Sequence, residues 1–594
     1  MALKRGAGVV LSLLGFAVLV SAAGFILLYL MVSAEPVLPE RGTLVLRPAG
    51  ALDELLPDDV LHLVRSRERQ TVRAYVEALR KAKVDRRIRA VVIAPRGLNS
   101  PFWAKVQELR EALLDFQASG KPVIAFLESG GDQAYYLATA ADRIVLVPTS
   151  DVSLTGLAMY DLFLRGTLDW AGAYPDFLHI GDYKTAINLY TESTSTAAQR
   201  EMNESLTEDQ YAQLVRGIAD GRGKTEAEVR QLIDEGPFTA DAAYAAGLVD
   251  ELGYQDELDD LVPALGGGDR LIEMHDYARV GDRSAGIRRG GTIALIHAVG
   301  TIVSGRSTFD PVNGPVLGSE TIIEHIRAAR ANPAVRAVVL RIDSPGGSSV
   351  ASDVIWRELM LIKEGENPRP LVVSMSDLAA SGGYYLAMAG DVIVAQPGTL
   401  TGSIGIFTGK FVTTGVFDKL GVNLEATSRG RQAEIYSPDR AFTPAEREKI
   451  MASMQAFYDQ FIEKAAEARQ TTPEKIAAVA QGRVWTGRQA REIGLVDEVG
   501  GLYTAIAVAK QRARMPEDQE VSLIVYPPRR SVLEVLAEGV PGTEAHADRA
   551  AAGVMARLVG PLERRAFASL LAPARLFRAG EGLALMPQAL VRQP

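Results

Sequence analysis

Ser381 is the residue whose type and neighbours best suit nucleophilic chemistry. It lies in the run AASGGYY, residues 379–385, which follows a predicted strand and opens a predicted helix. The small neighbours leave its hydroxyl uncovered, as a nucleophile requires. A serine in this place also suits an N-cap, because its oxygen accepts a hydrogen bond from the first turn of the helix. The run alone leaves both roles open.

A second run, DSPGG at residues 343–347, also follows a predicted strand and precedes a helix. The consecutive glycines Gly346 and Gly347 leave backbone N–H groups free to face an anion or a developing oxyanion. Phosphate binding is a competing role, but the sequence has no GxxxxGK[ST] run and no suitably placed GxGxxG run. A plain tight turn is the third interpretation.

A serine nucleophile needs a base, and the composition narrows the choice. The chain has no cysteine, which excludes thiol catalysis and cysteine-bound metal, and its six histidines form no metal-binding spacing. A lysine made neutral by burial can serve as the base. Lys184, in HIGDYKTAI at residues 179–187, stands among apolar and small residues. Its alternative role is that of a solvated lysine with a buried stem.

An internal repeat indicates how these residues are positioned. AVVI at 90–93 recurs as AVVL at 337–340, and GLVDELG at 247–253 recurs as GLVDEVG at 494–500. One offset of 247 residues relates both pairs. We therefore predict two tandem copies of one domain. Their predicted bounds are 41–265 and 290–520, with a linker at 266–289 and a C-terminal extension at 521–594.

Within the second copy, short β-branched runs alternate with longer amphipathic ones. Strands are expected at 293–299, 337–342, 371–375 and 392–395, and helices at 320–331, 350–362 and 383–389. This alternation is typical of an α/β fold with a largely parallel sheet, in which functional loops follow the carboxyl ends of the strands. Both candidate loops lie there.

The reactive residues are not repeated between the copies. Ser381 corresponds to Asp132, and DSPGG corresponds to RGLNS at residues 96–100. The counterpart of Lys184 lies near Arg431, whose guanidinium does not deprotonate in proteins. A purely structural cap and turn would not require this loss, so we expect the second copy to carry the nucleophile.

The N-terminal stretch from Gly6 to Ala34 contains no charged residue. We predict a transmembrane anchor at residues 7–34, since about 20 apolar residues span a bilayer core. A cleaved signal peptide is the alternative, although the stretch exceeds the usual apolar region of such peptides. Lys4 and Arg5 precede the helix, so its short N-terminus is expected in the cytoplasm and the remaining chain on the other side.

Four motifs together resemble the signal peptide peptidase A family. They are GDYKTA at 181–186, DSPGG at 343–347, ASGGY at 380–384 and TGSIGI at 401–406. The resemblance is to the long, tandem-domain form of these membrane-bound serine endopeptidases and extends from the anchor to about residue 520. It implies two tandem domains of the ClpP/crotonase-like fold and a serine–lysine dyad. Thr185 stands where the family motif commonly has serine, a mild departure.

The resemblance assigns a role to each matching residue. Ser381 is the nucleophile, and Lys184, supplied by the first copy, is the general base and acid. Ser403 orients the lysine amine. The backbone N–H of Gly346 or Gly347, with that of Gly382, forms the oxyanion hole. Neither a cofactor nor a metal is implied, and whether the dyad forms within or between chains stays open.

The resemblance also implies partners and a location. Expected substrates are signal peptides and other unfolded or short apolar peptides, and the expected assembly is a homo-oligomer, a tetramer in the family. The expected location is the bacterial inner membrane, crossed once, with the catalytic domains outside the cytoplasm. The net charge of −9 argues against nucleic-acid binding.

Two other functions remain open on the residues. Glycine-rich oxyanion turns also suit a crotonase-like acyl-CoA enzyme, although CoA substrates are cytoplasmic and the predicted domains are not. The second open function is that of a membrane-anchored scaffold without catalysis. It is disfavoured because the chain retains Ser381, Lys184 and the double glycine.

Overall fold

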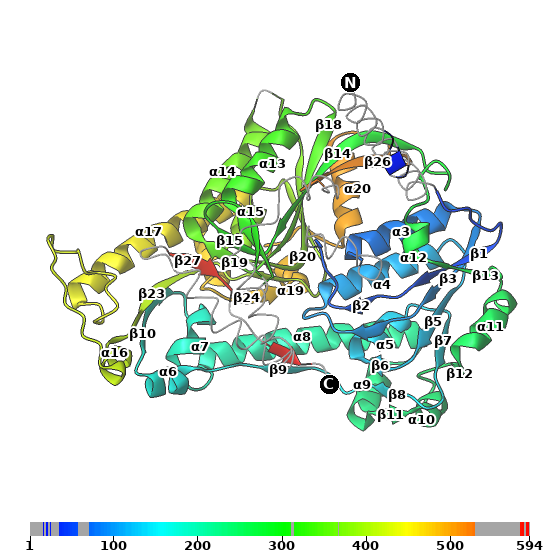
Figure 1. Ribbon diagram of the computed structural model, residues 1–594, viewed down its shortest axis with the longest axis horizontal. Coiled ribbons are helices and arrows are strands. Elements are labelled where there is room, and N and C mark those ends of the chain that lie inside the picture. The colour runs from blue at the N-terminus through cyan, green and yellow to red at the C-terminus, as the bar shows by residue number, and fades with distance from the viewer. Residues whose placement is uncertain are drawn as a thin grey trace, which may run out of the picture.

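The structure is a computed structural model of the full chain (Figure 1). It describes residues 16, 20, 21, 24, 35–56, 70–310, 314–365, 367–528, 582–586 and 590–592. Almost all of the predicted anchor at 7–34 and most of the predicted extension at 521–594 lie outside the described residues. Within the described part of the chain, no helix is both long and apolar enough to cross a membrane.

Two parallel sheets share one strand order, as expected of two copies of one domain. The first has the order β12-β7-β5-β3-β1-β13, made of Glu251–Leu252, Arg143–Leu146, Val123–Leu127, Ile88–Ile93, Gly42–Leu46 and Arg270–Glu273. The second has the matching order β25-β21-β20-β18-β14-β26, made of Glu498–Val499, Val392–Ala395, Leu371–Ala380, Val335–Ser344, Arg289–Val299 and Glu520–Tyr526. Beside β20 the second sheet continues into β22 (Leu400–Gly402) and the antiparallel β24 (Val484–Thr486). The fold is therefore α/β with a tandem repeat.

Each expected strand and helix of the second copy is present. The strands β13 and β26 fall in the stretches predicted as linker and extension, and each adds to the edge of its own sheet. Each pairs with a strand more than 200 residues earlier in the chain, and a local sequence pattern does not show such a pairing.

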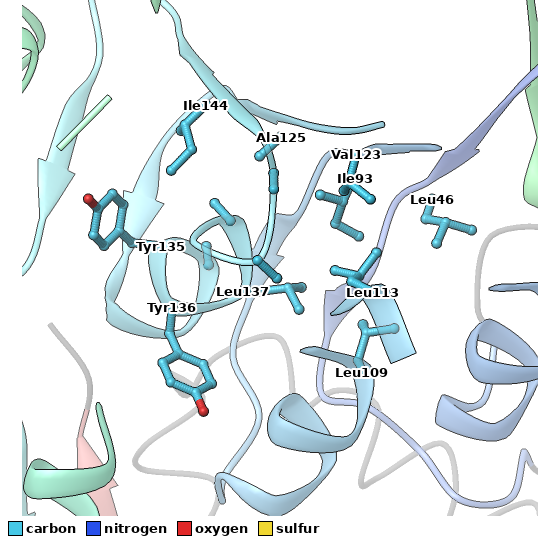
Figure 2. Packing of buried hydrophobic residues seen from close by; sticks show 14 of the residues in the cluster. Leu46, Ile93, Leu109, Leu113, Val123, Ala125, Tyr135, Tyr136, Leu137 and Ile144 are labelled. Atoms are coloured by element: carbon cyan, nitrogen blue, oxygen red, sulfur yellow. The ribbon is translucent and has the colours of Figure 1, made fainter. Parts of the chain in front are cut away.

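Helices cover both faces of the first sheet. Helices α3 (Val72–Val84), α4 (Ala104–Gln117) and α5 (Asp132–Ala138) pack on one face and α11 (Leu258–Ala264) on the other. Successive side chains of a strand point to opposite faces, so Leu44 and Leu46 enter one core and Val45 the other. Figure 2 shows the larger core, where Leu109 and Leu113 of α4 lie beside Leu137 of α5 and aliphatic residues of the strands.

The second sheet is covered in the same way. Helices α13 (Ser319–Ala331), α14 (Ser349–Glu364) and α15 (Gly382–Ala387) pack on one face, and α20 (Leu502–Arg512) packs on the other. The long helix α17 (Pro444–Ala468) completes the larger core, and its counterpart in the first copy is α8 (Ala197–Arg222). Thr443 and Thr196 cap these two helices.

A third sheet joins the two copies. Its order is β10-β23-β27-β19-β15-β17-β16, made of Tyr174–Ile180, Ile406–Val412, Leu583–Leu585, Gly346–Ser348, Thr301–Val303, Gly314–Gly318 and Thr308–Asp310. Strand β10 comes from the first copy, β27 from the C-terminal segment, and the others from the second copy. In Figure 1 the red strand β27 lies beside β19 and β23.

Buried charges also join the copies. Arg341 of β18 is fully buried and contacts Glu54 and Glu108 of the first copy, each at 2.6 Å. Burial alone would raise the pKa of Glu54, but the guanidinium holds it down at about 2. Burial raises the pKa of Glu108 despite the same partner. The cluster fixes the second sheet against α4.

The remaining elements connect these layers. The helical ones are α6 (Arg165–Ala171), η1 (Thr185–Ile187), α7 (Asn188–Thr191), α9 (Glu226–Glu235), α10 (Ala240–Ala245), η2 (Gln255–Glu257), α12 (Met274–Tyr277), α16 (Thr414–Leu420), α18 (Pro473–Val479) and α19 (Gly487–Glu492). The extended ones are β2 (Ala49–Gly50), β4 (Arg96–Leu98), β6 (Gly130–Gly131), β8 (Asp151–Ser153), β9 (Ala158–Tyr160), β11 (Phe238–Thr239) and β28 (Leu590–Arg592).

Candidate active site

Ser381 lies between strand β20 and helix α15, where the chain turns sharply. Its φ is 56° and its ψ is −113°, a conformation that costs a residue with a β-carbon about 1–3 kcal/mol. Two backbone hydrogen bonds hold it: its N–H donates to Gly402 O at 2.7 Å, and its carbonyl accepts from Tyr385 N at 2.9 Å. It occupies the N-cap position, yet its side chain makes no capping hydrogen bond. The hydroxyl is therefore turned away from the helix.

Lys184 brings its amine to this hydroxyl from the loop after β10. Its Nζ lies 2.8 Å from Ser381 Oγ, 3.0 Å from Ser403 Oγ and 2.9 Å from the Ser403 carbonyl oxygen. All three residues are fully buried. The structure thus brings together, across the two copies, the three side chains that the sequence pointed to.

The electrostatic surroundings favour a neutral amine. Among the described residues, no carboxylate forms an ion pair with Lys184. Burial lowers the pKa of Lys184 well below the ordinary lysine value. A neutral amine has a lone pair, so it can accept the hydroxyl hydrogen of Ser381. The Ser403 carbonyl can then accept one of the two amine hydrogens.

The loop that carries Lys184 packs against a turn of the second copy at backbone distance. Tyr183 N donates to Gln481 O at 2.9 Å. A β-carbon on Gly181 would lie 2.4 Å from Gln481 C, and one on Gly482 would lie 2.5 Å from Lys184 N. Both glycines also have positive φ, 101° and 77°, so only glycine fits at either position. Sequence reasoning missed Gly482, which lies in an ordinary QGR turn.

Ser403 is held as firmly as the other two residues. It has a φ of 51°, and its N–H donates to Arg483 O at 2.7 Å. It lies between β22, which pairs with β20, and β23, which pairs with β10, the strand that precedes the Lys184 loop. Strand pairing therefore fixes Ser403 relative to both members of the pair.

The glycines of the DSPGG run come close to the Ser381 loop. A β-carbon on Gly346 would lie 2.8 Å from Gly382 N, and one on Gly382 would lie 3.2 Å from Gly347 N. The N–H of Gly346 already donates to Ser344 Oγ at 3.2 Å. The sequence left open whether Gly346 or Gly347 supplies a backbone N–H to the oxyanion hole together with Gly382. Because the Gly346 N–H is already used, Gly347 is the better candidate.

Lys105 ties both loops to the first copy, and sequence reasoning missed it. Its Nζ lies 2.7 Å from Asp343 Oδ2 and 3.1 Å from Asp377 Oδ2. Asp343 Oδ1 in turn accepts from Leu378 N at 3.1 Å, three residues before the serine. Burial alone would lower the pKa of Lys105, but the two carboxylates raise it above its usual value. Burial raises the pKa of Asp377 to about 6 even with the lysine beside it.

The equivalent place in the first copy has no such arrangement. Asp132, the counterpart of Ser381, accepts hydrogen bonds from Thr155 N and Gly156 N, each at 3.2 Å. Burial raises its pKa to about 6. Arg431, near the counterpart of Lys184, is exposed. No lysine in the described part of the chain is hydrogen-bonded to Asp132.

The arrangement suits acyl transfer by a serine hydroxyl with an amine as base. Among the described residues, no group of three His, Asp or Glu side chains is placed to hold a metal ion. His297 is buried on β14, where desolvation lowers its pKa to about 4, and neither of its ring nitrogens has a hydrogen-bond partner.

Comparison with known proteins agrees with this chemistry. The chain matches the model of peptidase family S49 over residues 115–263 and again over 363–515. It is 35% identical to "Serine protease SPPA, chloroplastic" of Arabidopsis thaliana, over 80% of this chain and 71% of that one. It is 33% identical to "Protease 4" of Salmonella typhi, over 79% and 76% of the two chains. It is 30% identical to "Protease 4" of Haemophilus influenzae, over 75% and 74%.

Proposed function

Because the chain belongs to peptidase family S49 and is a serine peptidase, we propose that Ser381 and Lys184 form its catalytic dyad. The 2.8 Å contact between Lys184 Nζ and Ser381 Oγ carries this proposal. Lys184 is fully buried and has no paired carboxylate among the described residues, which supports the proposal because a charged lysine could not serve as a base. The strained backbone of Ser381 supports it further, since strain of this kind gathers at active sites.

The proposed reaction proceeds by an acyl-enzyme. Neutral Lys184 accepts the hydroxyl proton while Ser381 Oγ attacks the scissile carbonyl, and the resulting ammonium gives the proton to the leaving amine. Water then enters, loses a proton to Lys184 and attacks the ester, which frees Ser381. Ser403 keeps the amine directed at the hydroxyl throughout.

The oxyanion of the tetrahedral intermediate needs preorganised donors. We assign this role to the backbone N–H groups of Gly347 and Gly382, which the close approach of their loops supports. Gly346 contributes by lacking a side chain. Its N–H holds the turn through Ser344.

The substrates proposed are signal peptides and other unfolded or short apolar peptides. Met202 and Leu400 pack with Ala380, the residue before Ser381, and these apolar neighbours support an apolar substrate. The anchor at 7–34, a place in the bacterial inner membrane with the catalytic domains outside, and a homo-oligomer of four chains belong to the same proposal.

The domain bounds are also proposed. We extend the first domain to Glu273 and the second to Tyr526, because β13 and β26 complete equivalent edges of the two sheets. The acyl-CoA enzyme and the scaffold are not retained, since the matched family is one of peptidases.

Kinetics on a fluorogenic apolar peptide tests the dyad. The full chain in detergent should lose about 10⁴-fold or more in kcat with Ser381→Ala or Lys184→Met. Lys410→Met is the matched control, because Lys410 is also buried in the second copy and donates to a backbone carbonyl, Ile435 O. Either dyad variant with wild-type kcat overturns the assignment.

A further inference from the structure

The strand that leads to Ser381 bulges where it passes the strand that leads to the DSPGG turn. Strands β18 and β20 pair in register as far as Ile342, and pairing resumes at Ser344. Asp343 therefore stands opposite the three residues 376–378 of β20. A bulge of this kind bends its strand and re-aims the residues that follow it. Its shape sets where the serine turn lies relative to the DSPGG turn.

Two carboxylates lie at this bulge. Asp343 Oδ1 accepts from Leu378 N at 3.1 Å, so its carboxylate joins the two strands. Asp377 is buried in the bulge itself, and its Oδ1 accepts from the backbone N–H of Lys105 at 3.1 Å. Burial raises the pKa of Asp377, and the neighbouring Asp343 raises it further. The two carboxylates repel each other, so the bulge needs a cation between them.

The first copy supplies that cation from the first turn of helix α4, which lies beside β20 in Figure 1. Lys105 is buried, and its Nζ lies 2.7 Å from Asp343 Oδ2 and 3.1 Å from Asp377 Oδ2. It thus contacts Asp377 twice, through its amine and through its backbone N–H. The N-terminus of a helix also favours a carboxylate beside it. One residue of the first copy therefore holds both turns of the second copy where they begin.

The first copy has a different pair at the equivalent place. Arg96 corresponds to Asp343, and Glu128 lies four residues before Asp132, the same spacing as between Asp377 and the serine. Arg96 and Glu128 form an exposed ion pair with a 3.2 Å contact. Opposite charges attract each other without a third group, whereas the two carboxylates of the second copy do not. The second copy therefore depends on a lysine of the first copy at this place.

We propose that Lys105 is a positioning residue for catalysis, which sets the distance between the two oxyanion donors, the N–H groups of Gly347 and Gly382. The proposal rests on the proposed roles of these groups and of Ser381. Each donor lies four or five residues after one of the two carboxylates, so a shift of the bulge displaces it. The first copy then completes both parts of the site, since it also supplies Lys184. An ion pair that only stabilises the fold is the structural alternative, and it would leave the rate of the folded enzyme unchanged.

The kinetic test measures kcat and KM of the full chain on an apolar fluorogenic peptide. Lys105→Met should lower kcat about 100-fold, as expected for an oxyanion donor displaced by about 1 Å, and should change KM less than about twofold. A peptide aldehyde, which forms an oxyanion adduct with the serine, should bind about 100-fold more weakly. The rise of kcat with pH should stay in place, because the low pKa of Lys184 is caused by burial and not by Lys105.

Lys81→Met is the matched control. Lys81 is also a buried lysine of the first copy, but it donates to two backbone carbonyls, Tyr277 O and Val280 O. This variant should change neither kcat nor the affinity for the aldehyde. An equal loss of kcat in folded Lys81→Met and Lys105→Met enzymes overturns the inference.

A second variant avoids leaving two carboxylates without a cation. Asp343→Ala keeps Lys105 paired with Asp377 and removes only the carboxylate that joins the strands, so it tests the inference even where the loss of the lysine unfolds the chain. It should lower kcat by a similar factor. Because Lys105 and Asp343 act as one unit, the double variant should be no slower than the slower single variant. Wild-type kcat in either folded single variant, or losses that multiply in the double variant, overturn the inference.

Hydrogen exchange separates this inference from the dyad assignment, because it needs no catalysis. In chains that all carry Ser381→Ala, Lys105→Met should speed amide exchange about tenfold or more in residues 343–349 and 376–383. Exchange in strands β1 and β3 of the first sheet should not change. Unchanged exchange in both segments overturns the inference. If only the dyad assignment is wrong, Ser381→Ala keeps the wild-type kcat and the exchange difference remains.

Discussion

Replacing Gly482 with alanine tests how closely the rate depends on the position of the Lys184 amine. The added β-carbon would lie 2.5 Å from Lys184 N and 2.6 Å from its Cα and Cβ. Ordinary contacts of this kind begin at 3.4 Å, so the lysine backbone or the turn must give way by about 1 Å. A misplacement of about 1 Å costs on the order of 100-fold in rate. We therefore expect kcat to fall by about that factor.

Gly421→Ala is the matched control. Gly421 ends helix α16 with a φ of 68°, close to the 77° of Gly482, but a β-carbon there would meet no atom within 4 Å. Both variants impose a left-handed conformation on alanine, at a cost of roughly 1–2 kcal/mol in the free energy of unfolding. Only the Gly482 variant moves the lysine.

The assay is kcat and KM on a fluorogenic peptide from neutral to alkaline pH, with urea unfolding of each variant. In the Gly482 variant, the rise of kcat with pH should also move to higher pH, because a displaced amine regains water and its pKa returns toward the ordinary value. A folded Gly482→Ala enzyme with wild-type kcat, or an equal loss in Gly421→Ala, would refute the reasoning.

Three further predictions concern stability. Lys184→Met should raise the free energy of unfolding near neutral pH by about 1 kcal/mol or more, because the unfolded chain binds a proton that the buried amine gives up. Urea unfolding curves should show this gain shrink as the pH rises toward about 10. Arg341→Met should lower the free energy of unfolding by about 3–5 kcal/mol, since Glu54 and Glu108 stay buried without their partner. A loss below about 1 kcal/mol in urea unfolding would contradict this expectation. The raised pKa of Asp132 makes the wild type lose stability as the pH rises from about 4 to about 6. Asp132→Asn should remove about 3 kcal/mol of that loss in urea titrations and leave kcat unchanged.

The elements with long, regular patterns could be predicted from the sequence. The β-branched runs of the second copy are strands β14, β18, β20 and β21, and the single offset of the repeat reappears as one strand order in two sheets. The proposed nucleophile and base come from residue types together with a resemblance, and the structure brings their side chains together. Spacing alone left Ser381 open as a helix cap and Lys184 open as a solvated lysine.

Contacts between the copies could not be predicted from the sequence. Lys105 lies on an amphipathic helix, and its place beside Asp343 and Asp377 depends on how α4 packs against the second sheet. Gly482 matters only because the lysine loop of the other copy touches it. Strand β27 has only three residues, which are too few to show a period. Its partner β19 lies more than 200 residues earlier in the chain.

Because the site is divided between the two copies, its proposed chemistry depends on contact between them. Burial lowers the pKa of the Lys184 amine well below the ordinary lysine value, and the loop that carries this lysine contacts the Gln481 turn of the second copy. If the two copies separated, water would return, the pKa would rise, and the base would hold a proton. The buried Arg341 cluster and the Lys105 bridge keep the copies together at the same interface. The proposed dyad therefore couples activity to docking of the two copies, although only the second copy carries Ser381.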